Sequence, residues 1–535
     1  MARNSALVFI FLLSSFGLSA QTNRYIVYLK DKIGTPFSIS NPEQFLSQRS
    51  IQRRANQKIN VIAEDLPINP TYRQQLQATG ASVFFSSKWM NCILVETTPT
   101  IFSVIGSLPF VERIELVAPG KKLTSGRLQK IRKIKNTFFT PATNVQLSMI
   151  GIDSMHLDGF KGEGISLAVF DSGFEGVDTG SPFKPIFKEG RLSYSFDFVA
   201  NSKNIFQYDD HGTEVFSVIA AYLPGSFAGG AYNATYSLFV TEDVGSEYRI
   251  EEYNWLFAAE KADSAGVDII NSSLGYNLFD DPKMNYSKDT DLNGSTAIVS
   301  LAAKKSLEKG MMVVCSAGNE GSNSWKFVTP PSDVDGLLAI GSVTSAEVKS
   351  SFSSIGPTSD GRVKPDVVAL GSGTSVITAG GSVGASSGTS VAAPLITSLA
   401  AGIWQRYPYL TSAELYKAII NSADQALKPD PLKGYGIPNY NAIKNFLDTI
   451  KIDEDFVIYP NPTNDSLRVA FKKPEGQSVF ISIFDLQGKL FSEYTSVVTW
   501  TNNPLIIELT SLSAGLYFIK VKSNDSVKTF RVAKL

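Results

Sequence analysis

Four polar residues carry the groups that nucleophilic hydrolysis requires: Asp171, His211, Asn319 and Ser390. A serine nucleophile needs a base within hydrogen-bond reach, a group that fixes the tautomer of that base, and donors for the oxyanion. One serine, one histidine, one aspartate and one asparagine would supply this set. Histidine is scarce, since the chain has two. His156 has no strand end or glycine-rich turn beside it, so we expect it on the surface or in packing.

Ser390 lies in "GASSGTSVAAPL", where small residues surround it and an alanine-rich apolar run continues to about Trp404. A Gly-Thr-Ser turn that leads into a helix places Ser390 in the first helical turn. Unpaired backbone N–H groups and the helix dipole favour negative charge there. Serine is also a favoured N-cap residue. This stretch alone therefore leaves two readings open, a capping serine and a nucleophile.

The elements around these residues alternate between strand and helix. Apolar, partly β-branched runs predict buried strands at 164–170, 267–275, 311–319 and 336–344, and helical patterns lie at 211–223, 250–266, 295–310 and after Ser390. This alternation predicts an α/β fold, a mostly parallel sheet with helices on both faces. Functional sites in such sheets form beyond the carboxyl ends of the strands, where Asp171 and Asn319 stand.

The motifs around these residues resemble the signature blocks of the subtilisin-like serine peptidases. The matching blocks are "AVFDSGF", "DHGTEV", "INSSLG", "SAGNEG" and "SSGTSVAAP", in the family's order over roughly residues 140–445. The order aspartate, histidine, serine is also that of subtilisin. The resemblance implies that Asp171 orients His211, that His211 deprotonates Ser390, and that Asn319 and the Ser390 backbone N–H hold the oxyanion.

The same resemblance implies where a peptide substrate binds. One wall of the specificity pocket, which also pairs with the substrate backbone, would be Ser273, Leu274 and Gly275; the other wall would be Ser316, Ala317 and Gly318. The sequence departs from the family at Glu214, where a second histidine is common. Two readings of Glu214 stay open: it raises the imidazole pKa, or it faces a loop.

A calcium loop is a further hypothesis, at "KDTDLNGS". Asp289, Asp291 and Asn293, followed by a glycine, match the start of an oxygen-rich calcium loop, but the twelfth position is Ser300 instead of a glutamate. The alternative is a polar loop in which Ser295 caps the next helix. No cofactor is expected for the chemistry itself, and structural calcium is compatible with the family.

Composition and charge define the class of protein. The chain has 535 residues, 43% hydrophobic and 19% charged, with a formal net charge of -1. These values are typical of globular protein and give no electrostatic case for nucleic acid or an anionic membrane. The two cysteines, Cys92 and Cys315, form no metal-binding motif, and Cys315 lies in an apolar strand-like run. We therefore expect a fold held by its core, without a disulfide framework.

The N-terminal part divides into three predicted segments. Residues 1–20 combine Arg3, the apolar run "ALVFIFLL" and a small-residue end, which predicts a secretory signal with cleavage near Ala20; a buried helix is the alternative. Residues 21–120 resemble the family's inhibitory propeptide, a small α/β sandwich, and an independent binding domain is the alternative. Residues 121–140 are basic and predict an exposed linker, with maturation between Lys121 and Asn144.

The remaining chain comprises the peptidase-like domain, 141–447, and a C-terminal unit, 455–535. Short strands separated by turn residues predict a β-sandwich in the C-terminal unit. The motifs "YPNP", "DLQGK", "LSAGLYFIKV" and "VAKL" resemble the sorting domains of the type IX secretion system of some Gram-negative bacteria. A carbohydrate- or protein-binding β-module is the alternative. The resemblance implies export through the periplasm to the cell surface or the medium by the type IX secretion machinery. No stretch after the signal is long and apolar enough for a membrane anchor, so we expect no transmembrane anchor.

Two functions from different classes follow. The first is a secreted serine endopeptidase that cleaves protein or peptide substrates through an acyl-enzyme and is inhibited by its own propeptide. The second is a surface or binding protein on a peptidase scaffold that no longer cleaves. Such a relic would be expected to lose at least one of Asp171, His211, Asn319 and Ser390, yet all four are present. We therefore favour the enzyme, and expect activity to fall as the histidine protonates near its ordinary pKa of about 6.5.

Overall fold

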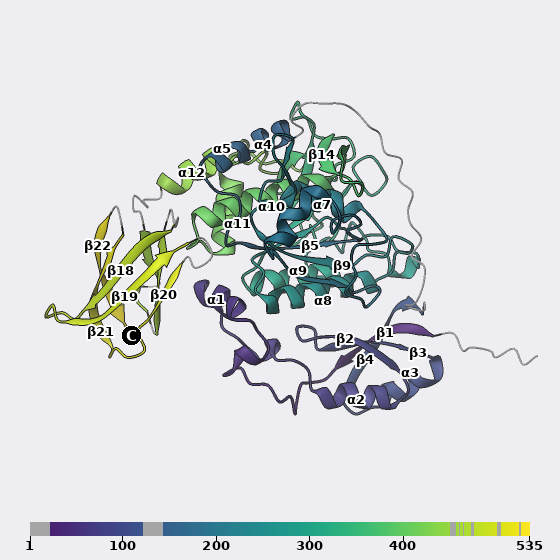
Figure 1. Cartoon of the computed structure of the whole chain (residues 1–535). Helices are drawn as coiled ribbons and strands as arrows, with labels where there is room; N and C mark the ends of the chain where they lie inside the picture. Colours follow the sequence, from purple (N-terminus) through teal and green to yellow (C-terminus); the bar gives the residue numbers. More distant parts are fainter. Residues whose placement is uncertain are drawn as a thin grey trace, which may run out of the picture.

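The computed structural model describes residues 22–120, 143–449 and 456–535, the last range without positions 460, 464, 472–475, 500–503 and 524–525. The predicted signal, 1–20, and the predicted linker, 121–140, lie outside the described residues. Figure 1 shows an N-terminal unit beside helices α8 and α9, a central domain, and a C-terminal unit of strands.

The N-terminal unit is a four-stranded antiparallel sheet in the order β2-β3-β1-β4. Its strands are β1 (Asn23–Leu29), β2 (Ser82–Ser87), β3 (Cys92–Thr97) and β4 (Val111–Pro119), and its helices are α1 (Gln48–Asn56), α2 (Pro70–Ala78) and α3 (Pro99–Gly106). The sequence "SVFFSSKWMNCILVE" forms two strands, because a turn at 88–91 folds it into a hairpin.

Both faces of this small sheet are buried. Along β1, Tyr25 and Val27 pack into a core with α2 and α3, whereas Ile26 and Tyr28 pack into a core shared with the central domain. Side chains alternate between the two faces of a strand, so one strand can serve both cores. The N-terminal unit therefore docks on the central domain through its sheet.

The central domain is built on a seven-stranded parallel sheet in the order β13-β12-β11-β10-β5-β9-β6. The strands are β5 (Ser166–Asp171), β6 (Leu192–Asp197), β9 (Thr235–Val240), β10 (Ile269–Ser272), β11 (Met312–Ser316), β12 (Leu338–Val343) and β13 (Val367–Leu370). Two small hairpins accompany it, β7 (Tyr222–Leu223) with β8 (Phe227–Ala228) and β14 (Thr374–Ile377) with β15 (Val383–Ser386).

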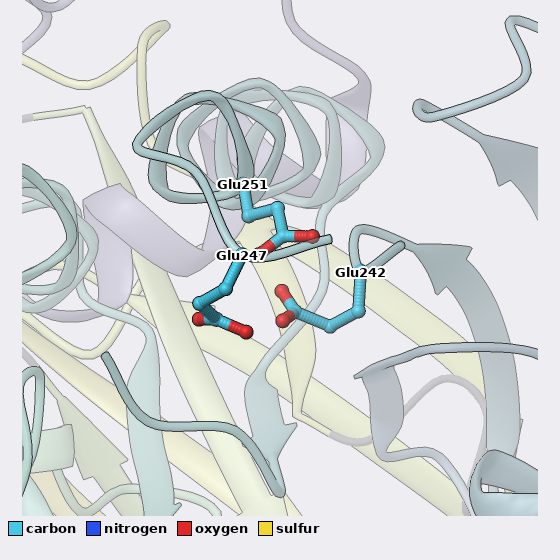
Figure 2. Close-up of side chains that lie close together, drawn as sticks. All are labelled: Glu242, Glu247 and Glu251. Carbon is cyan, nitrogen blue, oxygen red and sulfur yellow. The ribbon is translucent and has the colours of Figure 1, made fainter. Parts of the chain in front are cut away.

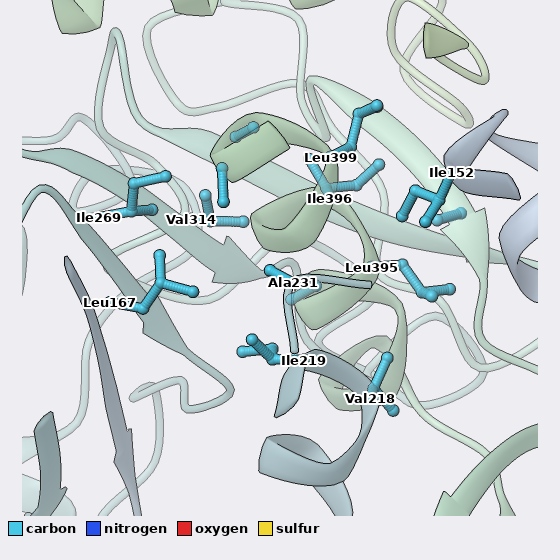
Figure 3. Packing of buried hydrophobic residues seen from close by; sticks show 14 of the residues in the cluster. Ile152, Leu167, Val218, Ile219, Ala231, Ile269, Val314, Leu395, Ile396 and Leu399 are labelled. Atoms are coloured by element: carbon cyan, nitrogen blue, oxygen red, sulfur yellow. The ribbon is translucent and has the colours of Figure 1, made fainter. Parts of the chain in front are cut away.

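Helices cover both faces of this sheet, as the sequence predicts. Leu167 and Val169 of β5 pack against helices α7 and α10 in the core shown in Figure 3, whereas Ala168 and Phe170 pack against α8 and α9. The helices are α4 (Asn144–Met149), α5 (Ile152–Leu157), α6 (Lys184–Lys188), α7 (His211–Ala220), α8 (Ile250–Ala265), α9 (Ile298–Glu308), α10 (Thr389–Arg406), α11 (Ser412–Asn421) and α12 (Tyr440–Thr449). The α/β fold class is thus confirmed.

One capping prediction is wrong. Helix α9 has Ala297 as its N-cap, two residues after Ser295. The backbone N–H of Ser295 instead donates to Asn293 Oδ1 at 2.8 Å, so Ser295 belongs to the preceding polar loop.

The C-terminal unit consists of two antiparallel sheets, β16-β17-β20 and β19-β18-β21-β22. Its strands are β16 (Phe456–Tyr459), β17 (Ser466–Phe471), β18 (Gln477–Phe484), β19 (Leu490–Val498), β20 (Leu505–Glu508), β21 (Gly515–Lys522) and β22 (Val527–Lys534). Apolar residues from both sheets form one core, so the unit is a β-sandwich.

Two further sequence expectations concern membranes and cysteine. Within the residues that the structure describes, no helix is long and apolar enough to cross a membrane. Cys92 and Cys315 are buried free thiols. The core, without a disulfide, holds the described chain together.

Candidate active site

Asp171 and His211 meet at the carboxyl edge of the parallel sheet. Asp171 is the last residue of β5 and is fully buried, and His211 is the first residue of α7. His211 Nδ1 lies 2.7 Å from Asp171 Oδ1. A hydrogen bond from Nδ1–H to the carboxylate leaves Nε2 as the ring's proton acceptor. The pair thus has the geometry of an imidazole base oriented by a buried carboxylate.

Gly212 makes this close approach possible. A Cβ at position 212 would lie 2.9 Å from Asp171 Cβ and would overlap the Gly173 carbonyl oxygen. Any side chain at 212 would push the start of α7 away from the end of β5.

A second carboxylate, Asp209, supports the pair, and the sequence reasoning did not identify it. Ser172 Oγ lies 3.1 Å from Asp171 Oδ1 and 2.9 Å from Asp209 Oδ2. Asp209 Oδ1 accepts hydrogen bonds from the backbone N–H groups of Asp210, at 2.8 Å, and His211, at 3.2 Å. A carboxylate at a helix N-terminus stabilises the helix. Asp209 therefore fixes the start of α7 and, with it, the backbone of His211.

Ser390 and Asn319 meet at the start of α10. Ser390 occupies the first turn, as expected, and is 9% exposed. Ser390 Oγ and Asn319 Nδ2 lie 2.8 and 3.6 Å from the point where a Cβ on Gly388 would stand. Asn319 Oδ1 accepts from the backbone N–H of Thr389 at 2.9 Å and from its hydroxyl at 3.1 Å. These two bonds fix the orientation of the Asn319 amide. Its NH₂ group is then positioned to donate a hydrogen bond to a group bound next to Ser390.

The predicted substrate walls follow neighbouring strands. Ser273, Leu274 and Gly275 follow β10, and Ser273 Oγ donates to the Ser390 carbonyl oxygen at 2.8 Å. The other wall begins at Ser316, the end of β11, and continues through Ala317 and Gly318. The parallel pairing of β10 with β11 brings the two segments to the same edge of the sheet.

Thr329 lies between the two walls, and the sequence reasoning missed it. A Cβ on Gly275 would overlap the Thr329 hydroxyl, and a Cβ on Gly318 would lie 3.0 Å from it. Thr329 is 3% exposed, and its hydroxyl has no hydrogen-bond partner among the described residues. The Thr329 side chain therefore occupies the space between the predicted walls.

The remaining sequence candidates are Glu214 and the predicted calcium loop. Glu214 lies in the first turn of α7 and is partly buried, and both readings of its role stay open. Asp291 accepts from the backbone N–H of Ser287 at 2.8 Å, and Asp289 lies 3.4 Å from the Lys288 ammonium. Asn293 is bonded within the same loop. The loop's own donors occupy several oxygens that calcium would need, and calcium at this loop stays a prediction.

Three family profiles match the chain. The subtilase family matches residues 162–437, the peptidase S8 propeptide domain of Bacteroidota matches 24–135, and the secretion system C-terminal sorting domain matches 457–534. The subtilase match lies within the central domain, the sorting-domain match lies within the C-terminal unit, and the propeptide match covers the N-terminal unit from residue 24 onward. The C-terminal match identifies a type IX sorting domain, which indicates export to the cell surface or the medium.

Comparison with individual proteins gives the same family. Subtilisin from Bacillus pumilus is 30% identical over 282 residues, which cover 52% of this chain and 90% of that protein. Subtilisin NAT from Bacillus subtilis subsp. natto is 31% identical over 283 residues, covering 52% of this chain and 65% of that protein. The solved structure of an epidermin leader peptide processing serine protease from Staphylococcus aureus shares the fold, with a TM-score of 0.54 and 14% identity over 79% of this chain and 99% of that one. The chain belongs to the subtilase family and is a serine-type endopeptidase with an S8 propeptide domain and a type IX sorting domain.

Proposed function

We propose that Ser390 is the nucleophile, His211 the general base and Asp171 the residue that orients it. Ser390 Oγ attacks the carbonyl carbon of the scissile peptide bond while His211 Nε2 takes the hydroxyl proton. The C–N bond then breaks, His211 returns the proton to the leaving amine, and an acyl-enzyme remains. Water repeats the sequence and releases the acid. The observation that carries this proposal is the 2.7 Å contact between His211 Nδ1 and buried Asp171.

The oxyanion of each tetrahedral intermediate would be held by Asn319 Nδ2 and the Ser390 backbone N–H. The Thr389 contacts orient the Asn319 amide before substrate arrives, so no reorganisation is needed in the transition state. The position of Ser390 in the first turn of α10 adds the positive end of a helix dipole.

The chain would be made as a zymogen. The sheet of the N-terminal unit shares a hydrophobic core with α8 and α9, and the sequence between this unit and the peptidase domain is basic and poor in large apolar residues. We propose that cleavage between Lys121 and Asn144 releases the N-terminal unit and gives the active enzyme.

Active-site labelling tests the catalytic roles. The wild type, processed by itself or by an added protease, should react with a fluorophosphonate probe and gain its mass on the peptide that contains Ser390. Ser390→Ala should gain none, and His211→Ala should label far more slowly. A folded, processed wild type that refuses the probe would contradict the proposal and favour the binding-protein alternative.

Asn319→Ala separates transition-state stabilisation from binding. Loss of the oxyanion asparagine lowers kcat about a hundred- to a thousandfold in subtilisin, and we expect a loss of that order here. KM should change little, because the oxyanion forms only in the transition state. Steady-state kinetics on one peptide, with active sites counted by the probe, measures both. A loss confined to KM would place Asn319 in ground-state binding.

A further inference from the structure

Three glutamates form a compact acidic cluster that the catalytic chemistry does not use. Glu242, Glu247 and Glu251 each offer one carboxylate oxygen, and these oxygens lie within 4.8 Å of one another. Figure 2 shows the side chains converging from the segment after β9, from the loop before α8 and from the first turn of α8. Glu242 and Glu247 are partly exposed, whereas Glu251 is buried.

Glu251 is the unusual member, because one of its oxygens is an unmatched buried acceptor. The residue is 1% exposed, and its Oε1 accepts from the backbone N–H of Asp243 at 2.9 Å. Its Oε2 is buried without a hydrogen-bond partner among the described residues. Burial, together with the neighbouring carboxylates of Glu242 and Glu247, raises the pKa of Glu251 well above its ordinary value. A buried acceptor without a partner is costly, and a cationic donor would remove that cost.

The cluster lies beside the predicted substrate wall. Strands β9 and β10 flank β5, and the loops that follow all three strands meet at one edge of the sheet. The backbone N–H of Thr241, next to Glu242, donates to the Asp171 carbonyl oxygen at 3.0 Å. Tyr276, which directly follows Gly275 of the wall, donates its hydroxyl hydrogen bond to Glu242. A residue of a substrate that pairs with Ser273–Gly275 would thus pass close to the glutamates.

We propose that Glu242, Glu247 and Glu251 bind the cationic side chain of a substrate lysine or arginine on the N-terminal side of the scissile bond. The inference rests on the proposed function, since it assigns the wall to substrate. A lysine or arginine supplies several charged donors on a long flexible stem. The carboxylates of Glu242 and Glu247 are partly exposed, and that of Glu251 is buried. This arrangement suits a long side chain that enters from solvent with its charged end first.

The chain's own predicted cleavage region has the matching charge. Residues 120–136, "GKKLTSGRLQKIRKIKN", contain seven lysines or arginines and no aspartate or glutamate. The first substrate of the enzyme would therefore be its own basic linker, and exported proteins with similar basic stretches would be later substrates.

Peptide pairs that differ by one charge test the proposal. Each pair carries lysine or glutamine at one of the second, third and fourth positions before the scissile bond, in an otherwise neutral sequence. At one of these positions, we expect lysine to raise kcat/KM of the processed wild type by about tenfold or more, the effect of one ordinary charge-assisted hydrogen bond. Active sites are counted with the fluorophosphonate probe, so that misfolded molecules do not enter the ratio.

Matched variants locate the effect. Glu242→Gln and Glu247→Gln should each reduce the lysine-to-glutamine ratio toward one, and the buried Glu251→Gln should do the same if it folds. Glu189→Gln is the control, because Glu189 is an exposed glutamate paired with Arg191 on the surface, and it should keep the ratio.

The outcomes separate this inference from the proposed function. A wild type that takes the probe and cleaves neutral and basic peptides equally would overturn the inference and leave the proposed function intact. The same holds if calcium raises the Tm of the wild type but not of Glu251→Gln and no basic preference exists, since the cluster would then be a metal site. A wild type that neither takes the probe nor cleaves any peptide would remove the proposed function, and this inference with it.

Discussion

The two terminal units are attached to the peptidase domain in opposite ways. The N-terminal unit contributes Ile26, Tyr28 and Trp89 to a hydrophobic core that also contains α8 and α9, whereas the core of the C-terminal unit consists of its own residues, such as Ile481 and Val521. A groove lined by α1 on one side and by Leu505 and Glu508 on the other runs beside the C-terminal unit. A hydrophobic core shared between two units is typical of units that stay bound to each other. A unit whose core consists of its own residues can be removed without exposing the core of its neighbour.

Buried charge strengthens the N-terminal attachment. Asp263 of α8 is fully buried and accepts from Arg53 at 2.5 Å, from Arg54 at 2.8 Å and from Lys88 at 3.3 Å. All three cations come from the N-terminal unit, and Arg54 also lies 3.1 Å from Asp65. In the docked arrangement, one carboxylate of the peptidase domain thus faces three cations of the N-terminal unit. This comparison predicts a tight but reversible inhibitor at one end and an independent tag at the other.

The largest predicted effect comes from Asp263→Ala. Breaking a buried ion pair by removing one partner costs about 3–5 kcal/mol, and here Arg53, Arg54 and Lys88 would all lose a buried counter-charge. In the full chain with Ser390→Ala, which prevents self-cleavage, amide hydrogen exchange in α1 should accelerate by about a hundred- to a thousandfold.

The control for that experiment is Asp153→Ala, an exposed residue of α5. It should leave exchange in α1 unchanged. Equal acceleration by both variants, or no acceleration by Asp263→Ala, would show that the ion network does not hold the N-terminal unit.

The second-largest expected effect is release of the N-terminal unit at acid pH. Despite burial, Lys88, Arg53 and Arg54 hold the pKa of Asp263 below its ordinary value, and Lys305 and Lys309 of the peptidase domain do the same for Glu64. Since docking lowers these pKa values, its stabilisation is complete above the ordinary values of about 3.9 and 4.3 and declines below them, as the pH falls toward the lowered pKa values of the docked state. A chain cut in the linker should co-elute as a complex at pH 7 and separate near pH 3 in size-exclusion chromatography. Tighter association at acid pH would contradict this assignment.

The smallest predicted effect is that of deleting residues 456–535. Because their core is self-contained, kcat/KM per labelled active site should change by less than about twofold, the usual limit for distant independent regions. Kinetics on one neutral peptide would measure the ratio. A large loss would show that the C-terminal unit supports the peptidase domain and would remove the contrast between the two units.

Much of this architecture could be predicted from the pattern of the sequence. The parts that could not be predicted depend on contacts that the pattern does not encode. The strands after which Asp171 and Asn319 stand are long apolar runs, so their burial and their parallel pairing could be predicted. Strand β9 (Thr235–Val240) was not among the predicted strands, and the glutamates after it were missed with it. Hydrophobic periodicity in the sequence indicates which segments are buried, but it does not indicate which loops lie together at the edge of the sheet.

Contacts between distant segments account for the other omissions. Thr329 lies in a loop without a motif, and only the fold brings its hydroxyl between Gly275 and Gly318. Asp209 differs from many surface aspartates only through its bonds to Ser172 and the start of α7. Residue type and spacing pointed to the residues that we propose to react, whereas Asp209 and Thr329 emerged only from the three-dimensional structure.

The central claim, that Ser390 frees the enzyme from its own bound N-terminal unit, is tested most directly by following mass and activity together. Purified wild type and Ser390→Ala would be sampled over time for intact mass and for cleavage of a peptide. We predict that wild-type activity rises as a cut appears between Lys121 and Asn144 and the N-terminal unit departs, while Ser390→Ala keeps its full mass and stays inactive. Full activity in a wild type whose N-terminal unit is still joined and docked would contradict the account.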